Sequence, residues 1–163
     1  AGIYKPVEAL KMTEQEWEKT IEINLKGYFL CAKIAAKEMA KKKWGRIINI
    51  ASIASGQVGI GFLNSAHYTA SKGGIIAMTE TLAGEWASKG ILVNAIGPGM
   101  IDTPMIDESG MNEEQIEATL SRIPLHRMGK PEEISAAVVF FASEEASYVN
   151  GATLFVDGGW LAV

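Results

Sequence analysis

The chain has 163 residues, of which 48% are hydrophobic, and a formal net charge of −4 at pH 7. These values are typical of one soluble domain with an apolar core, and they exclude a disordered or fibrous chain. The slight excess of acidic residues argues against nucleic acid as the main partner, because phosphate binding needs clustered positive charge.

The first predicted helix begins at a capping box, in which Thr13 accepts a hydrogen bond from the Glu16 amide and the Glu16 carboxylate reaches back. Apolar residues then recur at spacings of three and four, which predicts one long amphipathic helix ending near Trp44 and Gly45. The basic run 41–46 suits that end, because cations complement the helix dipole there. The apolar stripe consists of Trp17, Ile21, Leu25, Tyr28, Ala32, Ala35 and Met39.

The next segments alternate between strands and a helix. The isoleucine-rich segment 46–52 predicts a buried strand, and the glycine-rich loop 55–65 follows it. A second helix is predicted from about residue 66 to Lys89, because apolar residues line one of its faces and a glycine follows it. Segment 91–97 predicts another buried strand.

The last third of the chain begins with an irregular segment, 100–127. It contains a short helix that Asn112 caps, with Gln115 three residues later. Pro131 opens a further helix, and segment 152–159 predicts a strand and a glycine turn. Strands without polar alternation that are joined through helices indicate a parallel sheet covered on both faces, so the predicted fold class is α/β.

Cysteine and histidine usage limits the chemistry. Cys31 is the only cysteine, which excludes an internal disulfide and favours a reducing compartment. Its apolar helical surroundings predict a buried, unreactive thiol. His67 and His126 have no partners at metal-binding spacing, so we predict no metal site. No signal peptide is visible, and polar residues interrupt the longest uncharged run, 47–66, so we expect a cytoplasmic protein with no membrane segment.

Tyr68 and Lys72 lie four residues apart on the second predicted helix and therefore share one face. A nearby ammonium favours the phenolate and lowers the pKa of a tyrosine from its usual value near 10. We therefore expect Lys72 to make Tyr68 a useful acid or base near neutral pH. Ser52 ends a parallel strand, where ligands bind in open α/β sheets, and it offers a second donor to the same substrate oxygen.

Six segments, taken in order, resemble motifs of the short-chain dehydrogenase/reductase family, and the resemblance runs over essentially the whole chain. They are Asn24-Leu25, Asn49-Ile50-Ala51-Ser52, Tyr68-Thr69-Ala70-Ser71-Lys72, Asn94-Ala95-Ile96-Gly97-Pro98-Gly99 with Thr103, Arg127-Met128-Gly129-Lys130-Pro131-Glu132-Glu133-Ile134, and Val156-Asp157-Gly158-Gly159. The resemblance implies a Rossmann-like, doubly wound parallel sheet. It also implies that residues 1–163 form a single domain corresponding to the C-terminal, catalytic half of that fold.

The resemblance also implies a role for each matching residue. Tyr68 would exchange a proton with the substrate while hydride moves to or from the nicotinamide of NAD or NADP, and Ser52 would hold the substrate carbonyl. Lys72 would lower the tyrosine pKa and bind the nicotinamide ribose, and Asn24 would anchor a water-linked proton relay to Lys72. The nicotinamide carboxamide would lie against Pro98, Gly99, Ile101 and Thr103.

Several alternatives stay open at this point. Ser55 is the second candidate for the carbonyl donor, because the loop before Tyr68 looks slightly longer than is common in the family. Asn24 is also able to bond merely within its own helix. His67 is expected at the edge of the pocket or on the surface. Met100, Met105, Met111 and Met128 suit either an adaptable substrate pocket or a core.

The chain lacks the family's N-terminal features. Only Ala1-Gly2 match the motif that ends the family's fourth strand, and no Gly-x-Gly-x-x-Gly occurs. That missing turn is what holds the dinucleotide phosphates. We therefore expect an incomplete sequence that binds the cofactor poorly on its own, and a bare apolar edge on its first strand.

The leading functional hypothesis is an NAD(P)-dependent oxidoreductase that interconverts a secondary alcohol and a ketone. A sugar, sugar acid or small hydroxy compound is favoured as substrate, and the close alternative is a 3-oxoacyl carrier-protein reductase. An acidic carrier protein would need a basic surface, for which Arg122, Arg127 and Lys130 are the candidates. We expect a homodimer or homotetramer through the two long helices and the last strand. A non-catalytic assembly fragment is the alternative from another class.

Overall fold

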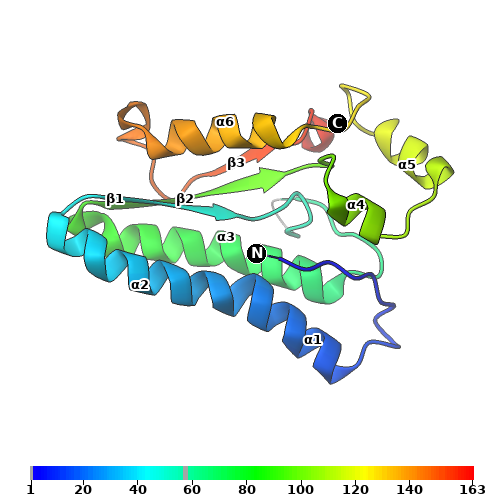
Figure 1. The fold of residues 1–163 in the computed structure, drawn as a ribbon, viewed down its shortest axis with the longest axis horizontal. Coiled ribbons are helices and arrows are strands. Elements are labelled where there is room, and N and C mark those ends of the chain that lie inside the picture. The colour runs from blue at the N-terminus through cyan, green and yellow to red at the C-terminus, as the bar shows by residue number, and fades with distance from the viewer. Residues whose placement is uncertain (1, 57–58) are drawn as a thin grey trace.

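The computed structural model describes residues 2–56 and 59–163, and its centre is a three-stranded parallel sheet (Figure 1). Strand β1 (Gly45–Ile50) pairs with β2 (Ile91–Pro98), which pairs with β3 (Thr153–Val156). Helices α1, α2 and α3 lie on one side of this sheet and α6 on the other. The predicted α/β class with a covered parallel sheet is confirmed.

Alternate residues of the strands fill two cores. On the α3 side, Ile91 and Val93 of β2 pack in one cluster with Leu82 and Trp86. On the α6 side, Ile96 is fully buried in a cluster with Phe141 and Ala146. Burial on both faces explains why these strands read as continuous apolar runs.

The first long helix is divided into three segments. Helix α1 (Glu14–Ile21) begins at the predicted capping box, with the Glu16 amide 3.2 Å from the Thr13 hydroxyl. A π-helical turn, η1 (Glu22–Lys26), then precedes α2 (Gly27–Lys42). Lys43, in the left-handed region with φ 49°, ends α2 slightly before the predicted Trp44 and Gly45. The structure adds the π turn, which the apolar spacing does not reveal.

The other predicted helices are confirmed. The second long helix is α3 (Ala66–Trp86), extended by a 3-10 turn (Ala87–Lys89) and ended by Gly90 at φ 74°. Asn112 and Gln115 form the predicted capping box, with the Gln115 amide 2.8 Å from the Asn112 Oδ1 atom. The later helical elements are α4 (Pro104–Glu108), α5 (Glu113–Leu120), α6 (Pro131–Ala142), η3 (Glu144–Ala146) and η4 (Trp160–Ala162).

Strand β1 lies at the edge of the described sheet, as expected. A groove of about 500 Å³ runs between β1 and α2. Cys31 lines this groove and is exposed, so the prediction of a buried thiol is wrong. The helical pattern places Cys31 on an apolar face, but no described residue covers that face. None of the helices within the described ranges is long and apolar enough to cross a bilayer.

Candidate active site

The carboxyl ends of β1 and β2 place Ser52 next to the start of α3. After β1, the chain stays beside β2, because the Ala51 amide donates to the Ile96 carbonyl at 2.7 Å and the Ile53 amide donates to the Pro98 carbonyl at 3.0 Å. The Ser52 hydroxyl accepts a hydrogen bond from the Ala54 amide at 3.0 Å. Backbone hydrogen bonds on both sides therefore fix the position of Ser52.

Tyr68 lies in the first turn of α3 and shares a hydrogen bond with the Ser52 hydroxyl. The Tyr4 ring packs edge-on against the Tyr68 ring, with 4.9 Å between centroids. Burial raises the pKa of Tyr68 above its usual value of 10, and the Ser52 hydrogen bond only partly opposes this increase. The net shift of the Tyr68 pKa is therefore upward, opposite to the decrease that we expected from Lys72.

Lys72 lies one helical turn after Tyr68 and close to its ring. Its ammonium donates to the Ile50 carbonyl at 2.9 Å and lies 5.6 Å from the Tyr68 ring centroid, over the ring. Burial lowers the pKa of Lys72 to about 8, since the charged form loses its hydration. Among the residues that the structure describes, no acidic side chain forms an ion pair with Lys72. The ammonium therefore has N–H groups left over for a ligand.

A cavity of about 430 Å³ lies on the Lys72 side of Tyr68, and we call it the Lys72 cavity. Every predicted site residue except Asn24 lines it. These are Ser52, Tyr68, Lys72, Pro98, Gly99, Ile101 and Thr103. The structure thus brings together seven residues that span 52 positions of the sequence.

A second cavity, of about 420 Å³, lies on the other side of Ser52 and Tyr68, and we call it the Arg122 cavity. Both cavities fall within the range of about 300 to 1,000 Å³ that is typical of small-molecule sites. The residues that line both are Ser52, Tyr68, Gly99, Met105 and Ile106. A molecule in one cavity is therefore able to meet a molecule in the other at the Ser52 and Tyr68 hydroxyls.

The lining of the Arg122 cavity comes mostly from residues that the sequence did not identify as one site. Met100, Met105 and Met111 line it, which supports the pocket interpretation for three of the four methionines. Met128 lines neither cavity and packs against a buried apolar cluster, to which Met100 and Met111 also contribute. Further lining residues that sequence reasoning missed include Tyr4, Ile60, Phe62, Thr119 and Trp160. No short motif contains them, because they come from widely separated segments.

Asn24 lies behind the site rather than in its cavities. It is fully buried in the π-helical turn, and its side-chain amide bonds the backbone N–H and carbonyl of Ile3, both at 2.8 Å. The same amide lies 3.4 Å from the Ser71 hydroxyl, which donates to the Tyr68 carbonyl at 2.7 Å. The side chain thus bonds outside its own helix and connects the beginning of the chain to the beginning of α3.

Two other polar residues near Tyr68 are placed differently from their expected positions. Ser55 is buried, lines neither cavity, and its hydroxyl has no hydrogen-bond partner among the described residues. His67 is 1% exposed, so its expected place at a pocket edge or on the surface is wrong. Its side chain points to the interior because α3 is buried on more than one face.

The Lys72 cavity fits the nicotinamide end of NAD or NADP. Lys72 offers free N–H groups to ribose hydroxyls, and the Thr103 hydroxyl, 3.3 Å from the Ile101 carbonyl, stands at the cavity wall. Gly99 lets the end of β2 approach the turn after β3 closely, since a Cβ there would lie 2.7 Å from the Asp157 Cα atom. No group of three His, Cys, Asp or Glu side chains suited to a metal ion occurs within residues 2–56 and 59–163.

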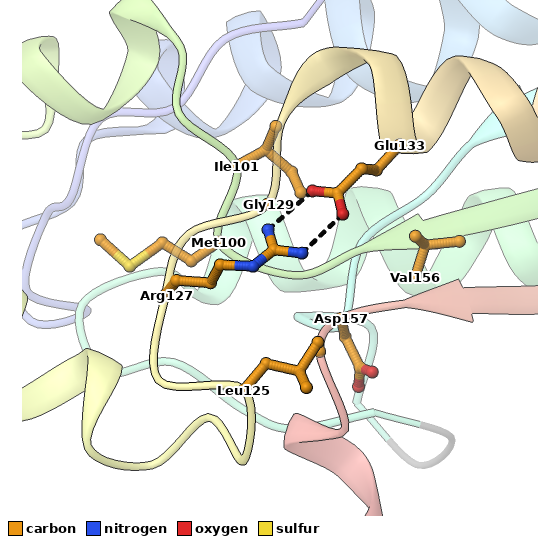
Figure 2. Close-up of a pocket in the computed structure, with 9 residues that line it drawn as sticks. Met100, Ile101, Leu125, Arg127, Gly129, Glu133, Val156 and Asp157 are labelled. Carbon is orange, nitrogen blue, oxygen red and sulfur yellow. Dashed lines mark hydrogen bonds and ion pairs between the residues drawn. The ribbon is translucent and has the colours of Figure 1, made fainter.

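Figure 2 shows a separate, smaller cavity of about 120 Å³, beside which Arg127 forms two hydrogen bonds with Glu133, of 2.7 and 2.8 Å. These bonds lower the pKa of Glu133 to about 2. The adjacent Gly129 pairs with Ile101 in an isolated β-bridge. The ion pair therefore holds the segment against which the cofactor-side residue Ile101 lies.

Comparisons with known proteins agree with this geometry. The family model described as enoyl-(acyl carrier protein) reductase matches residues 1–161. The 3-oxoacyl-(acyl-carrier-protein) reductase of Rickettsia prowazekii is 48% identical over 100% of this chain and 66% of its own length. The 2-dehydro-3-deoxy-D-gluconate 5-dehydrogenase of Escherichia coli is 41% identical over 99% of this chain and 63% of its own length.

Solved structures of dehydrogenases are also similar to this chain. A putative 2-deoxy-D-gluconate 3-dehydrogenase from Agrobacterium tumefaciens with bound NADP is 42% identical, with a TM-score of 0.94 over 100% of this chain and 65% of that chain. A gluconate 5-dehydrogenase from Burkholderia cenocepacia in complex with NADP and tartrate is 31% identical, with a TM-score of 0.95 over 100% and 63%. The chain thus spans somewhat less than two thirds of these relatives.

Proposed function

Because the chain belongs to the short-chain dehydrogenase/reductase family, whose members use NAD or NADP, we propose that it carries the active site of an oxidoreductase for secondary alcohols and ketones. The observation that carries this proposal is the position of Ser52 and Tyr68 between two cavities. One cavity also contains Lys72 and has the features that nicotinamide requires, and the other is free for a substrate. A function that uses only one cavity would not explain why both cavities meet at the Ser52 and Tyr68 hydroxyls.

In the reductive direction, the Tyr68 hydroxyl donates its proton to the carbonyl oxygen of the substrate. NAD or NADP, held by residues of the Lys72 cavity, would supply the hydride for the new C–H bond. The Ser52 hydroxyl donates a hydrogen bond to the same oxygen, which stabilises the charge that develops there. Burial keeps the Tyr68 phenol in its neutral, protonated form before the substrate is reduced.

Lys72 acts on the tyrosinate as it forms. With a pKa near 8 it is mostly an ammonium at pH 7, and its charge lies close to the Tyr68 ring. This charge stabilises the phenolate more strongly than it stabilises the neutral phenol. Its free N–H groups hold the nicotinamide ribose. Asn24 positions the start of α3 through Ser71, and we assign to it the anchor of a water-linked proton path toward Lys72.

A sugar, a sugar acid or another small hydroxy compound is the substrate class that we favour. The support comes from relatives named as gluconate and deoxygluconate dehydrogenases. The second candidate is reduction of a 3-oxoacyl carrier protein, supported by relatives of that name and by the apolar lining that the methionines give the Arg122 cavity. Turnover of D-gluconate compared with turnover of an acetoacetyl thioester separates the two.

The test of catalysis is the Tyr68→Phe variant of the protein expressed in full from its gene. Loss of the proton donor is expected to lower kcat by about 10² to 10⁴-fold and to leave cofactor binding intact. The matched control is Tyr148→Phe, because Tyr148 is fully exposed and lines neither cavity. Unchanged turnover in Tyr68→Phe would rule out the catalytic assignment and favour an assembly role.

The exposed apolar residues of α2 support a homodimer or homotetramer. Phe29, Leu30 and Ile34 are between 39% and 66% exposed, on a helix that buries Ala32 and Ala36. Such a patch marks an interaction surface. Light scattering of Ile34→Glu should therefore report a smaller assembly than the wild-type protein.

The single cysteine suits a reducing compartment, and we place the enzyme in the cytoplasm.

A further inference from the structure

Arg122 stands apart from the other arginines of the chain. Arg46 forms an ion pair with Glu144 at 3.5 Å, and Arg127 forms one with Glu133 at 2.7 Å. For Arg122, no acidic partner lies within ion-pair distance among the described residues. Its charge is therefore available to a ligand, although an exposed arginine also needs no partner when it simply faces water.

The position of Arg122 indicates that its charge faces a ligand rather than only water. It lines the Arg122 cavity, and of the described residues that line this cavity it alone carries a formal charge. The cavity also contains the Ser52 and Tyr68 hydroxyls, so the cation and the reacting groups face one space. A cation in a partly apolar cavity attracts an anion more strongly than one in open water.

An aromatic platform positions the guanidinium. The Arg122 side chain lies over the Trp160 ring, 5.4 Å from its centroid, in a cation–π contact. Trp160 is 5% exposed, and the Phe62 ring packs against it at 5.8 Å in an edge-on arrangement. In Figure 1, the end of α5 and the C-terminal turn that carries Trp160 lie at the same end of the molecule. The contact restricts an otherwise flexible side chain.

The chemistry of this pair matches a carboxylate. A guanidinium presents a planar fork of N–H donors that binds both oxygens of a carboxylate. The Arg122 guanidinium supplies these donors at one wall of the Arg122 cavity, and the Trp160 ring supports it there.

We infer that Arg122, supported by Trp160, binds the carboxylate of the substrate and so selects hydroxy acids and keto acids over neutral polyols. The inference rests on the proposed function, since it assumes that the substrate occupies the Arg122 cavity with its reacting carbon at Tyr68. The carboxylate takes no part in the bond changes. By binding Arg122, the carboxylate determines which hydroxyl group of the substrate reaches Tyr68.

The experiment measures binding rather than turnover. D-Gluconate and D-sorbitol serve as probes, because they differ at C1 in a carboxylate and a hydroxymethyl group. Calorimetry with the full-length protein in the presence of NADP+ gives the Kd of each probe for the wild type and for Arg122→Gln. We expect gluconate to bind at least tenfold more tightly than sorbitol, and Arg122→Gln to weaken gluconate binding by roughly 10- to 100-fold. Sorbitol binding should change less than about twofold.

The matched control is Arg46→Gln. Arg46 also stacks on a tryptophan, with 5.0 Å to the Trp44 ring centroid, but it lines neither of the two cavities at Tyr68. Its gluconate Kd should equal that of the wild type. Arg122→Lys should give an intermediate loss, because it keeps the charge and lacks the fork. Melting temperatures verify that each variant is folded.

Two results would overturn the inference: gluconate binding no tighter than sorbitol binding, or a gluconate preference that survives in Arg122→Gln. Both differ from failure of the proposed function. If Arg122 governs gluconate binding but no hydroxy compound is turned over, the dehydrogenase proposal fails and the carboxylate site stands. If turnover depends on Tyr68 but not on Arg122, the carboxylate site fails and the dehydrogenase proposal stands.

Discussion

The two cavities that meet at Tyr68 are built in different ways. The Lys72 cavity is lined mainly by the ends of β1 and β2 and by the first turns of α3, where the Lys72 ammonium bonds the Ile50 carbonyl, and residues of α4 and α6 complete it. The Arg122 cavity combines Tyr4, the loop residues 60–63, part of α4, and Arg122 and Trp160 near the C-terminus. One wall belongs to the sheet, and the other belongs mainly to loops and short helices.

This difference separates chemistry from specificity. Groups that transfer a proton must keep their geometry, and the ends of parallel strands provide rigid positions for them. Groups that choose a substrate lie on segments that are free to vary without disturbing the sheet. We therefore expect changes at the Lys72 cavity to lower turnover for every substrate, and changes at the Arg122 cavity to alter the ranking of substrates.

After Tyr68→Phe, the largest effect should come from a pair of serines that tests the placement of the carbonyl donor. Ser52→Ala removes a hydroxyl that faces both cavities, so kcat should fall by about 10² to 10³-fold, as for other lost oxyanion donors. Ser55→Ala removes a buried hydroxyl that lines neither cavity, so kcat should be nearly unchanged. Steady-state kinetics of the two variants decides between them. The opposite ranking would make Ser55 the donor.

Much of the Lys72 cavity was predictable from sequence, and the reason is physical. Its residues lie in short, continuous motifs at strand ends and at one helix start, where local structure dictates where each side chain points. Ser52, Tyr68 and Lys72 belong to this group. The direction of the pKa shift at Tyr68 was not predictable, because it depends mainly on how deeply the folded chain buries the phenol.

The Arg122 cavity could not be predicted in the same way. Arg122 and Trp160 are 38 positions apart, and no regular element connects them. Their contact arises from the path of the chain around the end of the sheet. From the sequence, Arg122 was a candidate only for a basic surface that binds an acidic carrier protein, and no role was predicted for Trp160. Likewise, the exposure of Cys31 depends on the groove along β1, which helical periodicity does not show.

A second prediction uses the pH dependence of stability at the Lys72 cavity. The pKa of Lys72 is about 8 when folded and near 10.5 when unfolded, so between these values the unfolded chain binds more protons. Stability conferred by this residue should therefore increase as pH rises from 8 toward 10.5. Relative to Lys72→Met, the wild type should gain roughly 2 to 3 kcal/mol of unfolding free energy between pH 7 and pH 10.

Urea unfolding of both proteins at several pH values measures this gain. Subtracting the Lys72→Met curve removes the contribution of all other lysines and tyrosines. Parallel curves would mean that Lys72 is hydrated in the folded state, and the Lys72 cavity would then be more open to water than the structure indicates.

A third prediction compares two glycines. A Cβ at Gly99 would lie 2.7 Å from the Asp157 Cα atom, so Gly99→Ala must push β2 away from the turn after β3. We expect a loss of about 1 to 3 kcal/mol in unfolding free energy, together with weaker cofactor binding. At Gly84, inside α3, a Cβ meets nothing within 4 Å, so Gly84→Ala should stabilise the protein by about 0.5 to 1 kcal/mol. Thermal unfolding of both variants measures the contrast, and equal melting temperatures would contradict it.

The smallest effect is expected at the ion pair between Arg127 and Glu133 in Figure 2. Arg127 and Glu133 are both substantially exposed, and exposed ion pairs contribute little, so Arg127→Gln should lower the melting temperature only slightly at pH 7. The pKa of Glu133 is depressed to about 2, so the stability from this pair is present above the ordinary carboxyl pKa of 4.5. As pH falls from 4.5 toward 2, the carboxylate becomes protonated, first in the unfolded chain and then in the folded protein. The difference between Arg127→Gln and wild type should therefore shrink over this interval in scanning calorimetry, and a difference that is constant from pH 7 to pH 2.5 would show that Arg127 contributes packing rather than charge.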